Sequence, residues 1–376
     1  MTGATPRWAG FGVDQFRAAA AAWLAEAADD APSDYGAIVP DSEVATAVAW
    51  QRRLADAGLA GLHWPVRWGG QGLTAAHTAA WLEECARAEV PPFLNMVGLV
   101  LTAEALLGYG TDEQKSAHLD KLRTGERLWC QLFSEPDAGS DLAHLRTRAQ
   151  HSGDGWVLDG EKIWTSNGHV ADWGICLART DPEAPAHAGI SFFLLDMRTP
   201  GIEVRPVRQI TGASEFDQVI LDQVAVPAES LLGDEGGGWA VAMSTLTHER
   251  NHIGALAIRL GLRLDRLAAG LPENPVRRAG AMGLWVRGRA MMALGSQQGR
   301  LGPVAASLMK LGVAELSVAA ADLAAGTAGP AAMLAGPVAT ELVAAPGAGI
   351  AGGSTQIQKT IVGERLLRLP REPAGA

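Results

Sequence analysis

Hydrophobic residues recur at spacings of three and four through the first third of the chain, the pattern of amphipathic helices. The segments with this spacing are residues 14–28, 41–58, 77–88, 101–110 and 111–125. Thr111 is placed to cap the last of them, which has acids in its first turn, and Gly58 and Gly125 follow two of the segments as C-terminal caps. The Pro-, Gly- and Trp-rich stretch 63–73 is predicted to be a loop.

The pattern changes between residues 127 and 233, where short β-rich runs are separated by Pro and Gly. The runs are residues 155–168, 189–197, 201–207 and 216–226. In the first run, Asp159-Gly160 is a dipeptide typical of a hairpin turn, so we expect the chain to reverse there.

Helical spacing returns from residue 234, where one long apolar seam indicates a bundle helix. Its members are Trp239, Met243, Leu246, Arg250, Ile253, Ala257, Leu260, Leu264 and Leu267. Arg250 stands where an apolar residue is expected and needs an acceptor, because an unpaired buried charge is costly. Glu249 lies at the edge of the same face. The change from helical to β-type spacing and back predicts three domains, at residues 1–126, 127–233 and 234–376.

Composition excludes several classes of protein. The 376 residues carry a net charge of −10 and no Lys/Arg run, which argues against a nucleic-acid partner. Three dispersed cysteines argue against a disulfide framework, and the first residues lack a signal-peptide pattern, so a cytoplasmic location is expected. The Ala/Gly-rich stretch 310–352 contains acids and prolines and is not expected to span a membrane.

Residues 248–252 read His-Glu-Arg-Asn-His, which matches the H-E-x-x-H signature of zinc proteases. Zinc requires a third protein ligand, and no H-x-x-G-x-x-H continuation follows. We therefore expect no metal, with His248 and His252 on the polar side of the helix.

Two stretches have compositions suited to a flat heteroaromatic ligand. Residues 132–149 contain small residues that allow backbone amides to approach a ligand, with hydroxyls at Ser134 and Ser140. Residues 160–168 end in Trp-Thr-Ser-Asn-Gly, which places an indole beside hydroxyls. The alternative for these stretches is a hairpin with a core tryptophan and a turn of hydroxyl residues.

The order of the motifs resembles the acyl-CoA dehydrogenase family from about residue 14 to residue 370. The matching strings include PVRWGGQGL, SEPDAGSD, KIWTSNG, RQITGASEFDQVILDQVAVP, a helix with Glu-Arg, and GGSTQIQKTIVGERLLRLP. The resemblance implies an α+β fold with an N-terminal helical domain, a middle β-barrel or sandwich domain and a C-terminal four-helix bundle. It also implies FAD as cofactor and an acyl-CoA or acyl-carrier thioester as substrate, with an electron-transfer flavoprotein as acceptor.

The resemblance also implies roles for individual residues. Ser134 would bond the pyrimidine side of the flavin, Trp164 and Ser166 would lie beside the isoalloxazine, and Ser140 would contact the CoA arm. The implied cofactor-binding residues are Gln131, Phe133, Ser134, Ser140, Trp164, Thr165, Ser166, Ser354, Thr355 and Gln356. The implied substrate-binding residues are Ser140, Leu246, Arg250, Gly352 and Gly353.

The catalytic base is implied to be Glu249. Many family members carry the base in the C-terminal loop, but this chain has Gly352 there, and glycine cannot accept a proton. Another branch of the family takes the base from the bundle helix directly before an arginine, which corresponds to Glu249-Arg250. A carboxylate at the rim of an apolar pocket suits proton abstraction, because desolvation raises its pKa. A backbone amide of Gly352 or Gly353 would polarise the thioester carbonyl.

One departure leaves alternatives open. The family's R-x-x-F-G and Q-x-x-G-G-x-G segments, which bind FAD pyrophosphate across a dimer, are absent, although Arg277 and Arg278 lie in the first region. Shortened actinobacterial members resemble this chain, and some work as unlike pairs. The chain is thus expected to form a homodimer, homotetramer or heterotetramer. A partner subunit with an incomplete FAD site, or a flavin monooxygenase of the same fold, are the other readings.

Overall fold

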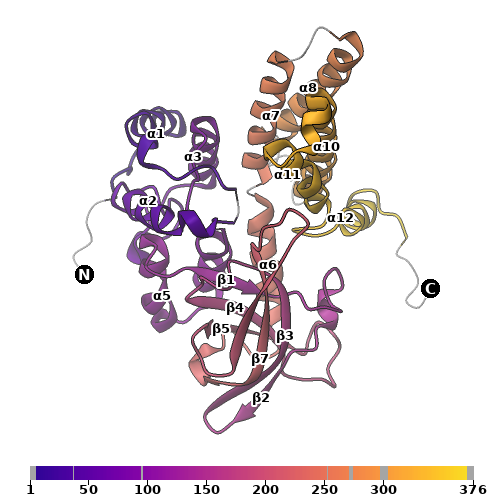
Figure 1. Cartoon of the computed structure of the whole chain (residues 1–376). Coiled ribbons are helices and arrows are strands. Elements are labelled where there is room, and N and C mark those ends of the chain that lie inside the picture. The colour runs from indigo at the N-terminus through magenta and orange to yellow at the C-terminus, as the bar shows by residue number, and fades with distance from the viewer. Residues whose placement is uncertain are drawn as a thin grey trace. The chain divides into compact units, whose positions relative to one another are not determined.

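The computed structural model describes residues 6–36, 38–94, 96–251, 253–270, 274–296 and 304–370. The chain forms two compact units, Met1–His248 and Glu249–Ala376 (Figure 1). The division into three domains with boundaries at residues 126 and 233 stays a prediction.

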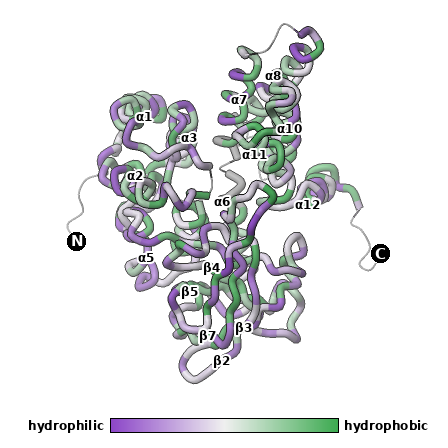
Figure 2. The backbone as a smooth tube through the Cα atoms, in the orientation of Figure 1, coloured by the Kyte–Doolittle hydropathy of each residue, from purple (hydrophilic) through white to green (hydrophobic). Residues whose placement is uncertain are grey.

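The first unit begins with helices, of which one π-helical segment is buried all round and the others bury part of their surface. They are α1 (Val13–Ala27), α2 (Val44–Asp56), α3 (Ala75–Ala88), the π-helical segment η4 (Val97–Thr102), α4 (Ala103–Tyr109) and α5 (Asp112–Thr124). Hydrophobic and hydrophilic residues alternate along α1 and α2 (Figure 2). Phe16, Trp50 and Leu54 lie in one core cluster, and the Trp50 indole donates to Pro91 O at 2.8 Å. The helical segments predicted from spacing are confirmed.

Both ends of α5 follow from its sequence. The Thr111 hydroxyl accepts from the backbone N–H of Gln114 at 3.2 Å, and the Gln114 side chain accepts from Thr111 N at 3.0 Å. Gly125 ends the helix in the left-handed conformation, with φ 74°. These contacts satisfy backbone groups that a helix end leaves unpaired, so the predicted caps are confirmed.

His118 on α5 is a buried histidine that is held neutral. Its ring packs edge-on against Trp129 and Trp173, with centroids 5.2 and 4.6 Å away. The Arg127 guanidinium donates to Nδ1 at 2.9 Å, which requires an unprotonated nitrogen. Burial, together with the charges of Arg127 and Lys121, lowers the pKa of His118 to about 4.

This neutral histidine makes the fold sensitive to acid. The unfolded chain takes up a proton near its ordinary pKa of 6.5, whereas the folded chain does so only near 4. The contribution of neutral His118 to the free energy of unfolding is therefore complete above pH 6.5. It is lost as the pH falls from 6.5 towards 4, and the loss amounts to up to about 3 kcal/mol. We expect His118→Gln to flatten the dependence of the unfolding free energy on pH between these values in urea titrations. The exposed His144 provides the control, and parallel curves for wild type and His118→Gln would contradict this assignment.

The remaining part of the first unit is a mixed sheet that the helices partly cover. Its strands are β1 (Trp129–Leu132), β2 (Arg148–Ser152), β3 (Gly155–Ser166), β4 (Trp173–Arg179), β5 (Ile190–Asp196), β6 (Ile202–Val207) and β7 (Phe216–Pro227). Their order is β1-β4-β2-β3-β7-β6, with β5 paired to β4. β1 runs parallel to β4, and β3 and β7 pair antiparallel. The β-rich runs at 189–197, 201–207 and 216–226 are confirmed as β5, β6 and β7.

Strand β4 and its partner β5 are buried on both faces. Leu177 and Leu194 belong to the cluster that includes Leu106 and Leu119 of the helices. Phe193, which points the other way, belongs to a cluster lined by the neighbouring strands. The sheet therefore curls round its own core on one side and packs against helices on the other.

The predicted hairpin turn at Asp159-Gly160 is wrong. β3 continues without reversal from Gly155 to Ser166, and its register against β7 shifts between Leu158 and Gly160. A Cβ atom on Gly160 would lie 2.5 Å from the Thr147 hydroxyl. Glycine is needed there for a close approach of two strands at a bulge, not for a turn.

The second unit is helical in its described residues. α6 (Gly238–Asn251) begins in the first unit, and α7 (Ile253–Ala269), α8 (Pro275–Ser296), α10 (Val304–Ala328), α11 (Pro337–Ala344) and α12 (Thr355–Ile361) follow. Ala257, Leu260 and Leu264 of the predicted seam pack with Met309 and Leu316 of α10. Arg250 and Ile253 of the seam have side chains outside the described part of the structure.

Among the residues that the structure describes, one helix is long and apolar enough to cross a membrane by length and composition. It comprises Val304–Met333, with a mean hydropathy of 1.5 in its most apolar window. Half of that window is buried within the structure, as in the core helix of a bundle.

Candidate active site

The structure brings two of the predicted motifs side by side in the first unit. The chain leaves β1 at Leu132, and its next residues run along the end of β3. The backbone N–H of Ile163 donates to Ser134 O at 2.9 Å, and Lys162 Nζ donates to Phe133 O at 3.2 Å. The SEPDAGSD stretch and the KIWTSNG stretch are therefore joined by hydrogen bonds into one element.

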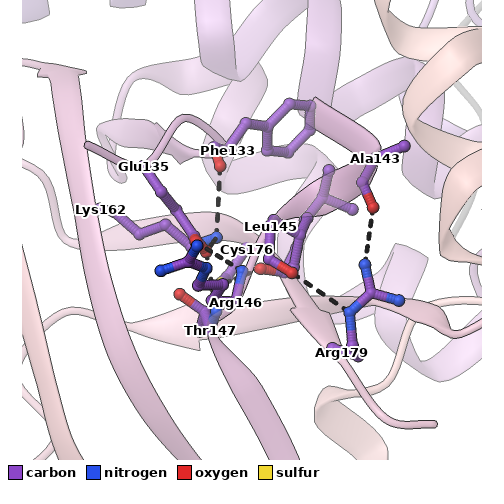
Figure 3. A network of polar contacts seen from close by, with 10 residues as sticks. Phe133, Glu135, Ala143, Leu145, Arg146, Thr147, Lys162, Cys176 and Arg179 are labelled. Atoms are coloured by element: carbon purple, nitrogen blue, oxygen red, sulfur yellow. Dashed lines mark hydrogen bonds and ion pairs between the residues drawn. The ribbon is translucent and has the colours of Figure 1, made fainter. Parts of the chain in front are cut away.

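A buried ion pair fixes this junction (Figure 3). Lys162 is fully buried, and its Nζ lies 2.8 Å from Glu135 Oε1. The same carboxylate accepts from the backbone N–H groups of Thr147 at 2.9 Å and Arg146 at 2.6 Å. Burial alone would raise the pKa of Glu135, but the ammonium and these hydrogen bonds outweigh it and lower the pKa. The carboxylate thus stays charged and keeps both chain segments in place.

Trp164 projects from this element into solvent. Trp164 is 55% exposed, its backbone φ is 62°, and its ring meets the Phe216 ring edge-on, with the centroids 6.0 Å apart. The register against β7 shifts between Lys162 and Thr165, so the bulge redirects the indole. A left-handed non-glycine residue costs of the order of 1 kcal/mol and more. Strain combined with an exposed flat ring is a typical feature of a ligand-binding position.

The other residues predicted to contact the flavin have distinct environments. Phe133 is buried against Phe192, Gln131 and Ser134 are half-buried, and Ser140 is exposed. Thr165 is fully buried, and its hydroxyl finds no hydrogen-bond partner in the described part of the chain, whereas the next residue, Ser166, is half-buried. Strand alternation thus turns Thr165 toward the interior and leaves Ser166 accessible.

The C-terminal motif lies in the second unit, where it starts a short helix. Ser354 caps α12 by accepting from Ile357 N at 3.3 Å, and the Thr355 hydroxyl donates to Gly349 O at 3.2 Å. Gly353 has φ 95°, and a Cβ there would lie 2.5 Å from the Gln358 amide. Gln356 is exposed.

The proposed base has a described backbone but no described side chain. Glu249 and Arg250 lie near the C-terminal end of α6, and their side chains are outside the described part of the structure. Leu246, one turn earlier, is half-buried. The two histidines of the H-E-x-x-H string also fall outside: the side chain of His248 is not described, nor is any part of His252. No group of three or more metal-binding side chains occurs among the residues that are described.

Sequence reasoning gave no role to Glu135 and Lys162, although both stand inside the quoted motifs. The signal was present: the two residues carry opposite charges, and each stands close to a predicted ligand-contacting residue, Glu135 directly after Ser134 and Lys162 two residues before Trp164. Their pairing spans 27 positions and needs the strand arrangement to become visible.

The chain belongs to the acyl-CoA dehydrogenase family, a family of flavoprotein oxidoreductases. Models of the family's N-terminal, middle and C-terminal domains match residues 13–126, 130–224 and 277–367. The fold is therefore that of an acyl-CoA dehydrogenase, as the resemblance implied, and the general dehydrogenase reaction follows from the family.

Curated relatives extend over nearly the whole chain. Acyl-CoA dehydrogenase IpdE1 of Mycobacterium tuberculosis is 36% identical over 390 residues, covering 96% of this chain and 99% of that protein. Acyl-CoA dehydrogenase FadE34 of the same organism is 40% identical over 377 residues, covering 93% of this chain but 50% of FadE34.

Solved structures with this fold include two complexes. The Tcur3481-Tcur3483 steroid ACAD has a TM-score of 0.85 and 26% identity, covering 96% of this chain and 98% of that one. A chain of the ChsE4-ChsE5 complex from Mycobacterium tuberculosis has a TM-score of 0.79 and 25% identity, covering 97% and 100%.

Proposed function

We propose that this protein binds FAD and oxidises an acyl-CoA thioester to its trans-2-enoyl thioester. The observation that carries the proposal is the element built from β1 and β3, in which buried Lys162 ties the Phe133–Ser134 backbone to the strand that presents Trp164. A flat exposed indole flanked by the accessible Ser134 and Ser166 suits a planar ring with polar edges. The residues present therefore fit a flavin.

Each residue then has a defined task. Trp164 packs on the ring, and the hydroxyls of Ser134 and Ser166 hydrogen-bond its polar edge. When bound, FAD supplies the acceptor for the hydride that leaves the β-carbon. Glu249 takes the α-proton, and a backbone N–H of Gly352 or Gly353 donates to the thioester carbonyl, which stabilises the negative charge developing there. Arg250 organises the pocket, and an electron-transfer flavoprotein is the acceptor.

A steroid-derived acyl-CoA is the substrate class that we test first. Support comes from the steroid ACAD structure, which is 26% identical to this chain over most of its length. Straight-chain and branched acyl-CoAs and carrier-protein thioesters provide the comparison set.

The test is the colour of the purified protein. We expect a yellow protein that absorbs at about 450 nm and is bleached by a substrate in the absence of oxygen. A protein that stays colourless after incubation with FAD, alone and with candidate partner subunits, would refute the proposal. A protein that is bleached by NADPH and reoxidised by oxygen, but not by acyl-CoA, would identify a monooxygenase instead.

A second candidate is a subunit of a heteromeric dehydrogenase. Two observations favour it: the sequence lacks both pyrophosphate-binding segments, and the Tcur3481-Tcur3483 steroid ACAD and the ChsE4-ChsE5 complex, which share this fold, each combine two protein names. In that case the isolated chain holds little FAD. Mixing it with a related subunit yields a complex of larger mass by light scattering, with FAD bound.

A further inference from the structure

A second polar cluster follows the end of β3, directly after Trp164–Ser166. The proposed function assigns no role to it. His169 follows this strand end by three residues. Its Nδ1 lies 2.8 Å from Asp217 Oδ2, and its Nε2 lies 2.7 Å from Asp41 Oδ1. The backbone N–H of His169 also donates to Asp217 Oδ2 at 3.0 Å.

The arrangement of the two carboxylates defines the protonation state of the ring. A carboxylate oxygen only accepts hydrogen bonds, so an imidazole between two carboxylates satisfies both only when both nitrogens carry a proton. Asp217 on β7 is fully buried, and its Oδ1 has no hydrogen-bond partner among the residues that the structure describes. If His169 lost a proton, one ring nitrogen would face a carboxylate with its lone pair. The buried Asp217 carboxylate would then lose the positive charge that compensates its own.

The residues that follow β3 are also hydrogen-bonded to the stretch of chain that leads into α2. The Asn167 side chain donates to Val39 O at 2.7 Å and accepts from Val39 N at 3.2 Å. Asp41 lies two residues further along that segment. Gly168 fits between these contacts because a Cβ there would lie 3.0 Å from Thr165 Cγ2 and 3.1 Å from Asp217 Oδ2. The strand end that carries Trp164 is therefore held from two elements, and His169 bridges both.

We propose that His169 is a positioning residue whose imidazolium, bridging Asp217 and Asp41, holds the Trp164–Ser166 strand end in the geometry that receives the flavin. The inference rests on the proposed function for its ligand. Losing the proton loosens the strand end, so flavin affinity falls as the pH rises.

The direction of the pH dependence follows from the groups around the ring. Burial lowers the pKa of His169, but the hydrogen bonds and charges of Asp217 and Asp41 outweigh it and raise the pKa above its ordinary value of 6.5. These are the charged groups that act on the ring, one from β7 and one from the Asp41–Glu43 turn. The stabilising effect is complete below pH 6.5 and is lost as the pH rises through the higher folded-state pKa.

The experiment compares His169→Gln with His144→Gln across a pH series that begins below 6.5 and extends into the alkaline range. His144 is an exposed histidine that also pairs with an aspartate, Asp141, so it is a matched control. We expect wild type and His144→Gln to lose flavin affinity with rising pH. We expect His169→Gln to bind flavin about tenfold more weakly at the acidic end, the order of effect of losing one charge-assisted hydrogen bond, and to show no such pH dependence.

A second readout does not require flavin. Hydrogen exchange of the 163–169 segment, corrected for intrinsic exchange, should increase with pH in wild type and be fast at every pH in His169→Gln. Wild-type exchange and wild-type pH dependence in His169→Gln would overturn the proposal. A chain that binds no flavin but shows the expected exchange refutes only the flavin assignment and supports His169 as a positioning residue.

Discussion

Glu249→Gln is expected to leave the flavin bound while abolishing its bleaching by acyl-CoA. Glutamine keeps the size and polarity of the side chain but cannot accept the α-proton at neutral pH. General base catalysis contributes a factor of about 10² to 10⁴, so the rate of anaerobic bleaching should fall by at least two orders of magnitude. Stopped-flow absorbance at the flavin band measures the rate directly.

The matched control is Glu235→Gln. Glu235 is a partly exposed glutamate shortly before α6, where it pairs with His151 at 3.3 Å. This variant should bleach at the wild-type rate. Undiminished bleaching in Glu249→Gln would place the base elsewhere. A second result would also contradict the assignment of Glu249 as the base. If the protein bound stoichiometric zinc and lost it on substitution of His248 and His252, Glu249 would belong to a metal site.

Lys162→Met should destabilise the protein by about 3–5 kcal/mol, the cost of breaking a buried ion pair by removing one partner. Methionine fits the space of the lysine stem, but Glu135 is left as a buried carboxylate without its counter-ion, and Phe133 O loses a donor. The midpoint of chemical denaturation should fall accordingly. Flavin retention should fall with it, since Ser134 and Trp164 lie on the two segments that Lys162 joins.

Two further variants distinguish the effect of burying the ion pair from the effect of forming an ion pair at all. Arg205→Met removes an exposed ion pair with Glu203, in which the two side chains are 52% and 57% exposed, and should leave the midpoint of chemical denaturation close to that of wild type, because solvent screens the pair. The double variant Lys162→Met/Glu135→Gln removes the buried charge while keeping an acceptor for the Thr147 and Arg146 amides. It should be more stable than Lys162→Met alone. Equal stability of Lys162→Met and wild type would show that the pair does not hold the junction.

Local signals were sufficient wherever the physical cause was local. The capping of α5 by Thr111 and Gly125 depends on backbone groups within one helical turn, and the sequence predicts it correctly. The dipeptide Asp159-Gly160 failed for the converse reason. It is typical of hairpins, but here the glycine is needed because the distant Thr147 packs against the strand, and no local pattern reports such a contact.

Strand β4 shows why the middle region was only partly predicted. Its sequence is a continuous apolar run, since both of its faces are buried, and such a run lacks the alternation that identifies a strand. β1 has only four residues, which is too short for a period to appear. Both strands became recognisable only through their pairing with each other.

The sequence by itself determined the family, the order of the helical and β regions and the short motifs, because these depend on residue type and spacing along the chain. Only the tertiary structure decided that Lys162 pairs with Glu135, that a bulge turns Trp164 outward while Thr165 faces inward, and that His169 bridges Asp217 and Asp41. The reason is physical: these contacts join residues that are 27 to 128 positions apart in the sequence. Such residues become buried and paired only once the strands and helices have packed.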